Sequence, residues 1–392
     1  MFTDFDRKAM ARALELAARG LTTTHPNPRV GCVIAQGERI VGEGWHERAG
    51  EAHAEVAALQ AAGGRAAGAT VYVTLEPCNH QGRTPPCAAA LLAARVARVV
   101  YAVADPNPRV DGGGAARLRE ARVRVEEGLM AGEAAELNCG FLKRMRHGRP
   151  WVRVKLAMSL DGRTALASGA SRWISGAAAR ADVQHWRARS SAVLTGVGTV
   201  LADDPRLDVR LPAGEGAEGQ QPLRVVLDSS LRTPPEARLF SVPGEVLILS
   251  ALPAADPRWE ARAAALAAQG ARIETLPAEA GRVPLFMALE RLGELEINEL
   301  QVEAGATLAG ALVRQSLVDE LLLYVAPKLL GPDARPLVAL PRLPDLAAAP
   351  SFGLVEARDL GGDARLRLRA GAELPAEADE ARASAAQAGE GG

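Results

Sequence analysis

Short apolar runs alternate with helix-forming stretches along most of this chain, and this alternation is the feature that most restricts its fold. Strands that are separated by helices are typical of layered α/β folds, in which helices cover the faces of a sheet. The first third of the chain is therefore predicted to be an α/β layer structure. The predicted strands are residues 29–35, 39–45, 69–77, 98–106 and 123–130, and the predicted helices are residues 52–64 and 87–97.

The alternation is interrupted at residues 142–151, where charged residues precede a Gly-Arg-Pro turn, and it then resumes as far as residue 327. A second α/β unit is expected there. We place the domain boundary at the interruption, which gives a first domain of residues 1–148 and a second of residues 149–371. Residues 372–392 are mainly Ala, Glu and Gly, a composition that predicts a disordered tail.

Length and charge narrow the class of protein. The chain has 392 residues, more than one typical domain, which agrees with two separate cores. Its formal net charge is -1, whereas proteins that bind nucleic acid usually carry a basic excess. Residues 1–20 carry charges throughout, unlike a signal peptide, and no run approaches the roughly 18 apolar residues of a membrane span. We therefore expect a cytoplasmic protein.

The stretch TLEPCNHQGRTPPC holds two of the four cysteines of the chain, Cys78 and Cys87. Four cysteines in a chain of this length do not make a disulfide framework, but two nearby thiolates can bind zinc together with further ligands. The best candidate for a third ligand is His53 in GEAHAEVAAL, and Glu55 follows two residues later. Residues i and i+2 lie about 200° apart around a helix, so both can face one site only if the start of the helix points at it.

Three protein ligands leave zinc a fourth position for water, as in catalytic rather than structural sites. Zinc lowers the pKa of that water to about 7, so hydroxide becomes available at neutral pH. His-x-Glu followed by Pro-Cys and a second Cys is the pattern of zinc deaminases, in which the Glu moves protons without binding the metal. The predicted zinc ligands are therefore His53, Cys78 and Cys87, and Glu55 is the predicted catalytic proton carrier.

Each of these residues has a simpler interpretation when taken alone. A single cysteine is often an ordinary buried thiol, and a single histidine is more often a surface or core residue than a ligand. The order and spacing of the four residues together favour the metal site. For Cys32, inside a predicted strand, and Cys139, near a helix end, we keep the simpler interpretation of small buried side chains.

Eight residues, NHQGRTPP, separate the two cysteines, whereas two are usual in zinc deaminases. This long form, with HPNPRVGCVI before it and DPNPRVDGGG after it, resembles the bifunctional deaminase/reductase family of riboflavin biosynthesis. The resemblance covers residues 1 to about 370 in collinear order. It continues in the second half through KLAMSLDGRTA, SRWIS, GVGTVLADDPRLDVR, VVLDSS, VEAGATLAGAL and VDELLLYVAPKLLG.

The resemblance implies a cytidine-deaminase-like three-layer α/β/α domain followed by a dihydrofolate-reductase-like α/β domain. It implies that the first domain deaminates a diaminopyrimidinone carrying a phosphoribosylamino group, and that the second uses NADPH to reduce the ribosyl chain to a ribityl chain. The implied cofactors are Zn²⁺ and NADPH. The expected partner is this small molecule, rather than nucleic acid or a membrane, and we also expect a homo-oligomer, a dimer or a tetramer.

The resemblance also implies residue roles. Asn27 in HPNPRVG matches a position that contacts the pyrimidine ring, although an asparagine in a turn can also simply cap the next strand. The implied NADPH contacts are Ala157, Trp173, Thr199, Asp203, Ser229 and the run Gly305, Ala306, Thr307, Leu308, Ala309, Gly310 and Ala311. The implied substrate contacts are Ser171, Arg187, Leu207, Arg210 and Glu303.

Physical chemistry bears on parts of this set. Gly305 lies between a predicted strand and a predicted helix, where backbone N–H groups can hold phosphate, although such a glycine is often only a turn. Arg187 and Arg210 would suit a sugar phosphate because guanidinium groups bind phosphate with a fork of donors; the alternative is a solvated surface arginine. Two positions depart from the family. Ala306 replaces the usual proline but keeps the backbone donors, and Gly113 replaces a common basic residue that could contact phosphate.

Other functions remain open from the sequence. A nucleic-acid or nucleoside zinc deaminase with an accessory domain should show a basic groove, stacking aromatics and the short cysteine spacing, whereas aromatic residues make up only 4% of this chain. A structural zinc module needs a fourth protein ligand, for which His80 is the obvious candidate. A Rossmann dehydrogenase is rejected, because GVG at residues 196–198 lacks the third glycine and the downstream acid of that fingerprint.

Overall fold

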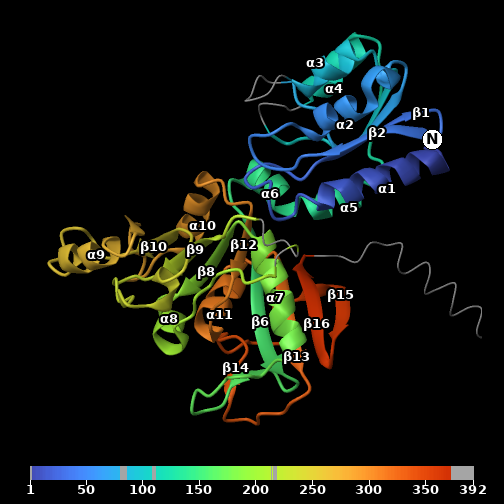
Figure 1. Cartoon of the computed structure of the whole chain (residues 1–392). Helices are drawn as coiled ribbons and strands as arrows, with labels where there is room; N and C mark the ends of the chain where they lie inside the picture. The colour runs from blue at the N-terminus through green and yellow to red at the C-terminus, as the bar shows by residue number, and fades with distance from the viewer. Residues whose placement is uncertain (1, 80–85, 108–111, 213, 215–218, 372–392) are drawn as a thin grey trace, which may run out of the picture.

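The chain folds into two α/β units, as the computed structural model shows for residues 2–79, 86–107, 112–212, 214 and 219–371 (Figure 1). The tail predicted for residues 372–392 lies outside the described residues. The elements of the first unit are α1 (Asp4–Ala18), β1 (Gly31–Gln36), β2 (Arg39–Trp45), α2 (Ala54–Ala62), η1 (Gly63–Ala66), β3 (Thr70–Leu75), α3 (Cys87–Ala93), β4 (Arg98–Val103), α4 (Gly113–Glu120), β5 (Arg124–Glu127), α5 (Ala131–Leu137) and α6 (Cys139–His147).

The first unit has three layers. Its sheet has the order β2-β1-β3-β4-β5, antiparallel from β2 to β3 and parallel from β3 to β5. Successive side chains of a strand face opposite sides of the sheet. Cys32 and Ile34 of β1 pack in a core with α2, α3 and α4, whereas Val33 and Ala35 pack against α1 on the other face. The predicted α/β/α architecture is confirmed, and so is the burial of Cys32.

The second unit is built on a larger sheet of order β11-β10-β9-β8-β12-β6-β13-β16-β15. The strands from β11 to β13 are parallel, and β16 and β15 close the sheet as an antiparallel hairpin. Strands β8, β9, β10 and β13 are buried over most of their length, which explains their nearly continuous apolar sequences, whereas the edge strand β11 is partly exposed. Its elements are β6 (Trp151–Ser159), β7 (Arg163–Ala165), α7 (Ala177–Arg189), β8 (Ala192–Gly196), α8 (Val197–Asp203), β9 (Leu223–Leu227), η2 (Arg238–Phe240), β10 (Val246–Ser250), α9 (Trp259–Ala267), β11 (Ala271–Thr275), α10 (Leu285–Glu294), β12 (Glu299–Val302), α11 (Ala306–Arg314), β13 (Glu320–Ala326), β14 (Arg335–Pro336), β15 (Phe352–Leu360) and β16 (Asp363–Ala370).

The segment between the two units is helical where the sequence pattern indicated an interruption. Residues 142–147 are predicted to break the pattern, but they form the last six residues of α6, because their basic residues lie on a helix whose apolar side is buried. The helix ends at Gly148, whose φ of 68° is a left-handed conformation that favours glycine. The break in regular structure is therefore shorter than predicted and falls at residues 148–150.

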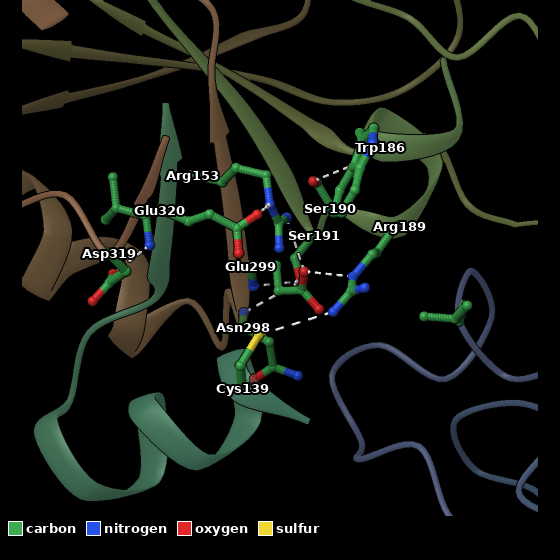
Figure 2. Close-up of polar contacts among 12 residues, drawn as sticks. Cys139, Arg153, Trp186, Arg189, Ser190, Ser191, Asn298, Glu299, Asp319 and Glu320 are labelled. Atoms are coloured by element: carbon green, nitrogen blue, oxygen red, sulfur yellow. Dashed lines mark hydrogen bonds and ion pairs between the residues drawn. The ribbon is translucent and has the colours of Figure 1, made fainter. Parts of the chain in front are cut away.

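A buried ionic network lies where the two units meet. Glu299, at the start of β12, accepts hydrogen bonds from Arg153 at 3.0 Å and from Arg189 at 2.8 Å, as Figure 2 shows. It also accepts one from Arg29, which belongs to the first unit. The same carboxylate therefore links the sheet of the second unit to the first unit. Among the described helices, none is long and apolar enough to cross a membrane.

Candidate functional site

The predicted zinc ligands come together in the structure. His53 Nδ1 lies 3.2 Å from Cys87 Sγ and 3.6 Å from Cys78 Sγ, and all three ligand atoms lie within 4.8 Å of one another. Tetrahedral zinc, with bonds of about 2.0 Å to nitrogen and 2.3 Å to sulfur, places neighbouring ligand atoms roughly 3.5 Å apart. The three side chains therefore fit a single zinc ion. His80, the candidate for a fourth ligand, lies outside the described residues.

The start of α3 holds the two cysteines together. Cys87 is the first residue of α3, as predicted, and Cys78 lies in the loop after β3. The Cys78 Sγ accepts the Cys87 backbone N–H at 3.4 Å, so the thiolate faces the positive end of that helix. A hydrogen bond from the Cys87 thiol, together with His53, outweighs burial and lowers the pKa of Cys78 to about 4. Both features favour a thiolate that can bind a cation.

The start of α2 brings His53 and Glu55 to the same place. His53 is the N-cap of α2 and Glu55 lies in its first turn, which is the geometry that their spacing required. A Cβ on Gly44 of β2 would lie only 2.4 Å from Ala58 N and 2.6 Å from Ala54 O, so glycine is needed for α2 to lie this close to the sheet. Burial raises the pKa of Glu55 to about 7, while a nearby cation such as zinc would oppose that rise.

A cavity of about 440 Å³ opens beside this cluster and is lined by His53, Glu55, Cys78 and Asn27. His46 lines the same cavity. Its Nδ1 lies 3.0 Å from Ala52 O, and its Nε2 lies 3.0 Å from Asn27 Nδ2. Because a carbonyl can only accept, Nδ1 carries the proton and Nε2 accepts from the Asn27 amide. His46 therefore fixes the Asn27 amide, and no described residue holds its Oδ1 atom.

Two cavity carboxyl groups were not predicted from the sequence. Glu76 accepts from the backbone N–H of Ala115 at 3.1 Å and of Asp105 at 3.4 Å, which links the loops after β3 and β4. Burial raises the pKa of Asp105 to about 6, and its Oδ1 accepts the Asn107 N–H at 2.9 Å. Both acids follow adjacent parallel strands, whose carboxyl ends meet at one edge of the sheet. The acids in TLEP and DPNP each follow a predicted strand, and this is the sequence signal that could have identified Glu76 and Asp105.

Several predicted cofactor residues gather at the corresponding edge of the second sheet. Ser229 follows β9, Thr199 lies on α8 directly after β8, and Gly305 follows β12 as the N-cap of α11. No side chain caps α11, and a Cβ on Gly305 would meet nothing within 4 Å. The first N–H groups of α11 are therefore open to a phosphate group. This edge fits a dinucleotide such as NADPH.

The remaining cofactor candidates lie in different environments. Trp173 is exposed beneath the Arg180 guanidinium, 4.6 Å from its ring, and Asp203 is exposed at the end of α8. Ala309 is fully buried in the core, and a Cβ on Gly310 would lie 2.2 Å from Ala339 O, so these two residues seat α11. Ala157 is half-buried on β6. In α11, Thr307 is exposed, whereas Ala306, Leu308 and Ala311 are half-buried.

The predicted substrate residues include one tight pair. Arg187 on α7 donates to both oxygens of Glu303, at 2.5 and 2.8 Å, and to Asp208 O at 2.9 Å. Burial alone would raise the pKa of Glu303, but Arg187 lowers it to about 2. Because these contacts occupy most of its fork, Arg187 is better suited to hold Glu303 than to bind phosphate. Arg210 is exposed and pairs with Asp208. Leu207 is buried and Ser171 is half-buried.

The fold and these two sites define a zinc-dependent deaminase joined to a nicotinamide-dependent reductase. Comparison with known families agrees with this class: residues 3–103 match the cytidine and deoxycytidylate deaminase zinc-binding region, and residues 150–366 match the RibD C-terminal domain. The chain is 52% identical over 372 residues to the riboflavin biosynthesis protein RibD of Escherichia coli, covering 93% of this chain and 99% of that relative. The chain belongs to the RibD family.

Solved structures of relatives have the same two-unit fold. RibD of Acinetobacter baumannii superposes with a TM-score of 0.85 at 46% identity, over 94% of this chain and 99% of that chain. A diaminohydroxyphosphoribosylaminopyrimidine deaminase/5-amino-6-(5-phosphoribosylamino)uracil reductase of Thermotoga maritima superposes with a TM-score of 0.81 at 30% identity, over 93% and 99%. The chain is thus a bifunctional deaminase and reductase of riboflavin biosynthesis that uses Zn²⁺ and NADPH, and a nucleic-acid deaminase is not favoured.

Proposed function

We propose that this chain deaminates diaminohydroxyphosphoribosylaminopyrimidine and then reduces the resulting 5-amino-6-(5-phosphoribosylamino)uracil with NADPH. The observation that carries the proposal is the His53, Cys78 and Cys87 cluster, which opens on a cavity that also holds the buried carboxyl group of Glu55. The Thermotoga maritima relative is named for both activities, and it matches 93% of this chain.

In the first reaction, we assign His53, Cys78 and Cys87 as the zinc ligands. Zinc held there supplies a Lewis acid that makes water a stronger nucleophile. The Glu55 carboxyl group takes a proton from the water that attacks the amidine carbon and delivers a proton to the amino group, which leaves as ammonia. Asn27, fixed by His46, contacts the pyrimidine ring through its free amide oxygen.

In the second reaction, the open N-terminus of α11 at Gly305 holds a phosphate group of NADPH, which supplies the hydride when bound. Arg187 orients the Glu303 carboxylate towards the substrate, and Arg210, which is exposed, contacts the sugar phosphate. The other residues assigned to the cofactor are Ala157, Trp173, Thr199, Asp203 and Ser229. The residues from Ala306 to Ala311 shape the same helix start. Ser171 and Leu207 complete the substrate site.

The proposal also assigns deamination to residues 1–148 and reduction to residues 149–371. The family matches, which end at residue 103 and begin at residue 150, support this division, as does the helix end at Gly148. We further propose a cytoplasmic homo-oligomer, a dimer or a tetramer, that binds small molecules and no nucleic acid. Light scattering on purified protein tests the oligomeric state, and a single-chain mass would contradict it.

The function is tested by following ammonia release and NADPH oxidation on the purified zinc-loaded protein. With diaminohydroxyphosphoribosylaminopyrimidine as substrate, ammonia should appear first and NADPH oxidation should follow. With 5-amino-6-(5-phosphoribosylamino)uracil, NADPH should be oxidised without ammonia release. Absence of ammonia with the first compound would overturn the deaminase assignment, and absence of NADPH oxidation with the second would overturn the reductase assignment.

A further inference from the structure

The cavity beside the zinc cluster is not built by the deaminase unit alone. One end is formed by His53, Glu55 and Cys78, but the cavity is also lined by Arg144 on α6 and by Glu296, which lies between α10 and β12 in the reductase unit. The deaminase cavity therefore reaches the junction of the two units. A substrate that fills it should contact residues from both.

Arg144 is a buried cation without a close anion. Only 10% of its side chain is exposed, and its nearest carboxylate is that of Glu296, which lies 3.9 Å away and is itself 63% exposed. By contrast, the buried Arg153 and Arg187 have carboxylate oxygens at 2.7 and 2.5 Å. Buried charges are normally paired, because desolvation is costly and an ion pair offsets it. This arrangement points to an anionic ligand that completes the pairing of Arg144.

The donors of Arg144 are directed by the reductase unit. Its Nε donates to Asn298 Oδ1 at 2.7 Å, and its Nη2 makes only a long 3.4 Å contact to Pro26 O. Asn298 Nδ2 donates to the same Pro26 carbonyl at 2.9 Å, one residue before Asn27. A guanidinium group has five N–H donors. Both N–H groups of Nη1 and one of Nη2 donate no hydrogen bond to a described residue, so they remain for a ligand.

Close packing holds α6 against this part of the reductase unit. A Cβ on Gly140 would lie 2.5 Å from Asn298 O, so the helix can approach the start of β12 only because residue 140 is glycine. Figure 2 shows Asn298 beside the first turn of α6 at Cys139. The position of Arg144 is therefore fixed relative to Asn27 by contacts that cross the junction.

We propose that Arg144 binds the phosphate group of the phosphoribosyl arm of the deaminase substrate, and that Asn298 is the residue that positions it. The inference rests on the proposed function, which supplies a substrate with a phosphate. A guanidinium fork matches phosphate oxygens and forms two charge-assisted hydrogen bonds with them. Among the described residues that line the cavity, Arg144 is the one arginine, and no lysine is present. Glu296, being mostly exposed, can remain in solvent when phosphate is bound.

The test compares two substrates for deamination: the phosphorylated compound and the same compound after phosphatase treatment. Arg144→Met should lower kcat/KM for the phosphorylated compound by about 10- to 100-fold, mainly through KM, because charge-assisted hydrogen bonds to the ground state are lost. It should change the value for the dephosphorylated compound by less than about threefold. Arg146→Met, on the exposed side of the same helix, is the matched control and should resemble wild type with both compounds.

Further variants separate binding from structure. Arg144→Lys keeps the charge but loses the fork, so it should show a smaller loss confined to the phosphorylated compound. Asn298→Ala should show the same selectivity, because it frees the guanidinium group without removing it. The inference would be overturned if kcat/KM fell equally for both compounds. It would also be overturned if Arg144→Met and Arg144→Lys kept the wild-type preference for the phosphorylated compound. A wild-type protein that releases ammonia from neither compound would overturn the proposed function itself.

Discussion

Replacing Glu299 by Gln should destabilise both units of the chain together. Glu299 is completely buried, and its two oxygens accept from Arg153, Arg189 and Arg29, the last of which belongs to the other unit. Glutamine has nearly the same shape but no charge, so Glu299→Gln would leave three buried guanidinium groups without their shared anion. Its amide group would also point a donor at one of them.

The magnitude follows from these contacts. Each charge-assisted hydrogen bond contributes about 1.5–3 kcal/mol, but the glutamine oxygen keeps part of this interaction. Removing one partner from a buried ionic group destabilises a protein by about 3–5 kcal/mol, because the remaining charges stay desolvated. For units of this size, that loss corresponds to a fall in Tm on the order of 10 °C.

The pH dependence has a definite sign. Burial alone would raise the pKa of Glu299, but Arg189, Arg29 and Arg153 hold it well below its ordinary value of 4.5. A carboxyl group whose pKa is lower in the folded state stabilises the protein fully above its unfolded-state pKa, and this stabilisation is lost as pH falls through the folded-state pKa. The deficit of Glu299→Gln should therefore be fully present at neutral pH, should begin to shrink as pH falls below about 4.5, and should vanish only in acid below the much lower folded-state pKa.

Thermal and urea unfolding followed by circular dichroism at neutral pH would measure this loss. Glu294→Gln is the matched control, since it removes a carboxylate that is 65% exposed and pairs with Arg291 at 2.7 Å, and such surface pairs contribute about 0–1 kcal/mol. The temperatures at which ammonia release and NADPH oxidation are lost report the two units separately, and both should fall. Wild-type stability in Glu299→Gln, or loss of only the reductase activity, would refute the reasoning.

Three further predictions concern the two sites. Glu55→Gln should retain zinc, measured by atomic absorption, yet lose deamination by at least the roughly 10²–10⁴-fold typical of a proton carrier; a near wild-type rate would exclude that role. Cys78→Ser and Cys87→Ser should each lose zinc and ammonia release, whereas the control Cys32→Ala, which changes a buried cysteine of the same unit, should keep both. Full zinc content in either serine variant would contradict the ligand assignment. Glu303→Gln should slow NADPH oxidation on deaminated substrate by roughly 100-fold, because the substrate is misplaced, while ammonia release stays normal. Equal loss of both rates would indicate general unfolding.

The spatial cluster of His53, Glu55, Cys78 and Cys87 was predictable because the information for it is local. His53 and Glu55 share one helix start, and Cys78 and Cys87 flank one loop, so their order along the chain carries the geometry. The pattern of strands and helices in the first unit was predictable for a similar reason, since apolar periodicity reports which side chains face the core. The antiparallel hairpin β15–β16 was missed, although the alternation of Leu and Arg in DARLRLRA is the period-two pattern of a strand.

The contacts between the units could not be predicted in this way. Arg29 and Glu299 are 270 residues apart, and nothing in HPNPRVG or INELQVEAG indicates that they meet. The role that we propose for Arg144 could not be predicted for the same reason, because it depends on Asn298, a residue 154 positions further along the chain. A buried arginine and a surface arginine look alike in a sequence, and only tertiary packing distinguishes them.

The same two elements carry both the junction and the reductase site. Strand β12 begins with Glu299 at the junction and is followed directly by Glu303, which we assign to the substrate site. Helix α7 supplies an arginine partner of each, Arg189 and Arg187. Zinc removal acts on side chains of the first unit alone, so reduction of deaminated substrate should survive it. A change at Glu299, by contrast, shifts elements that both reactions share. The two chemistries are therefore separable by their cofactors, whereas their stabilities are coupled through β12 and α7.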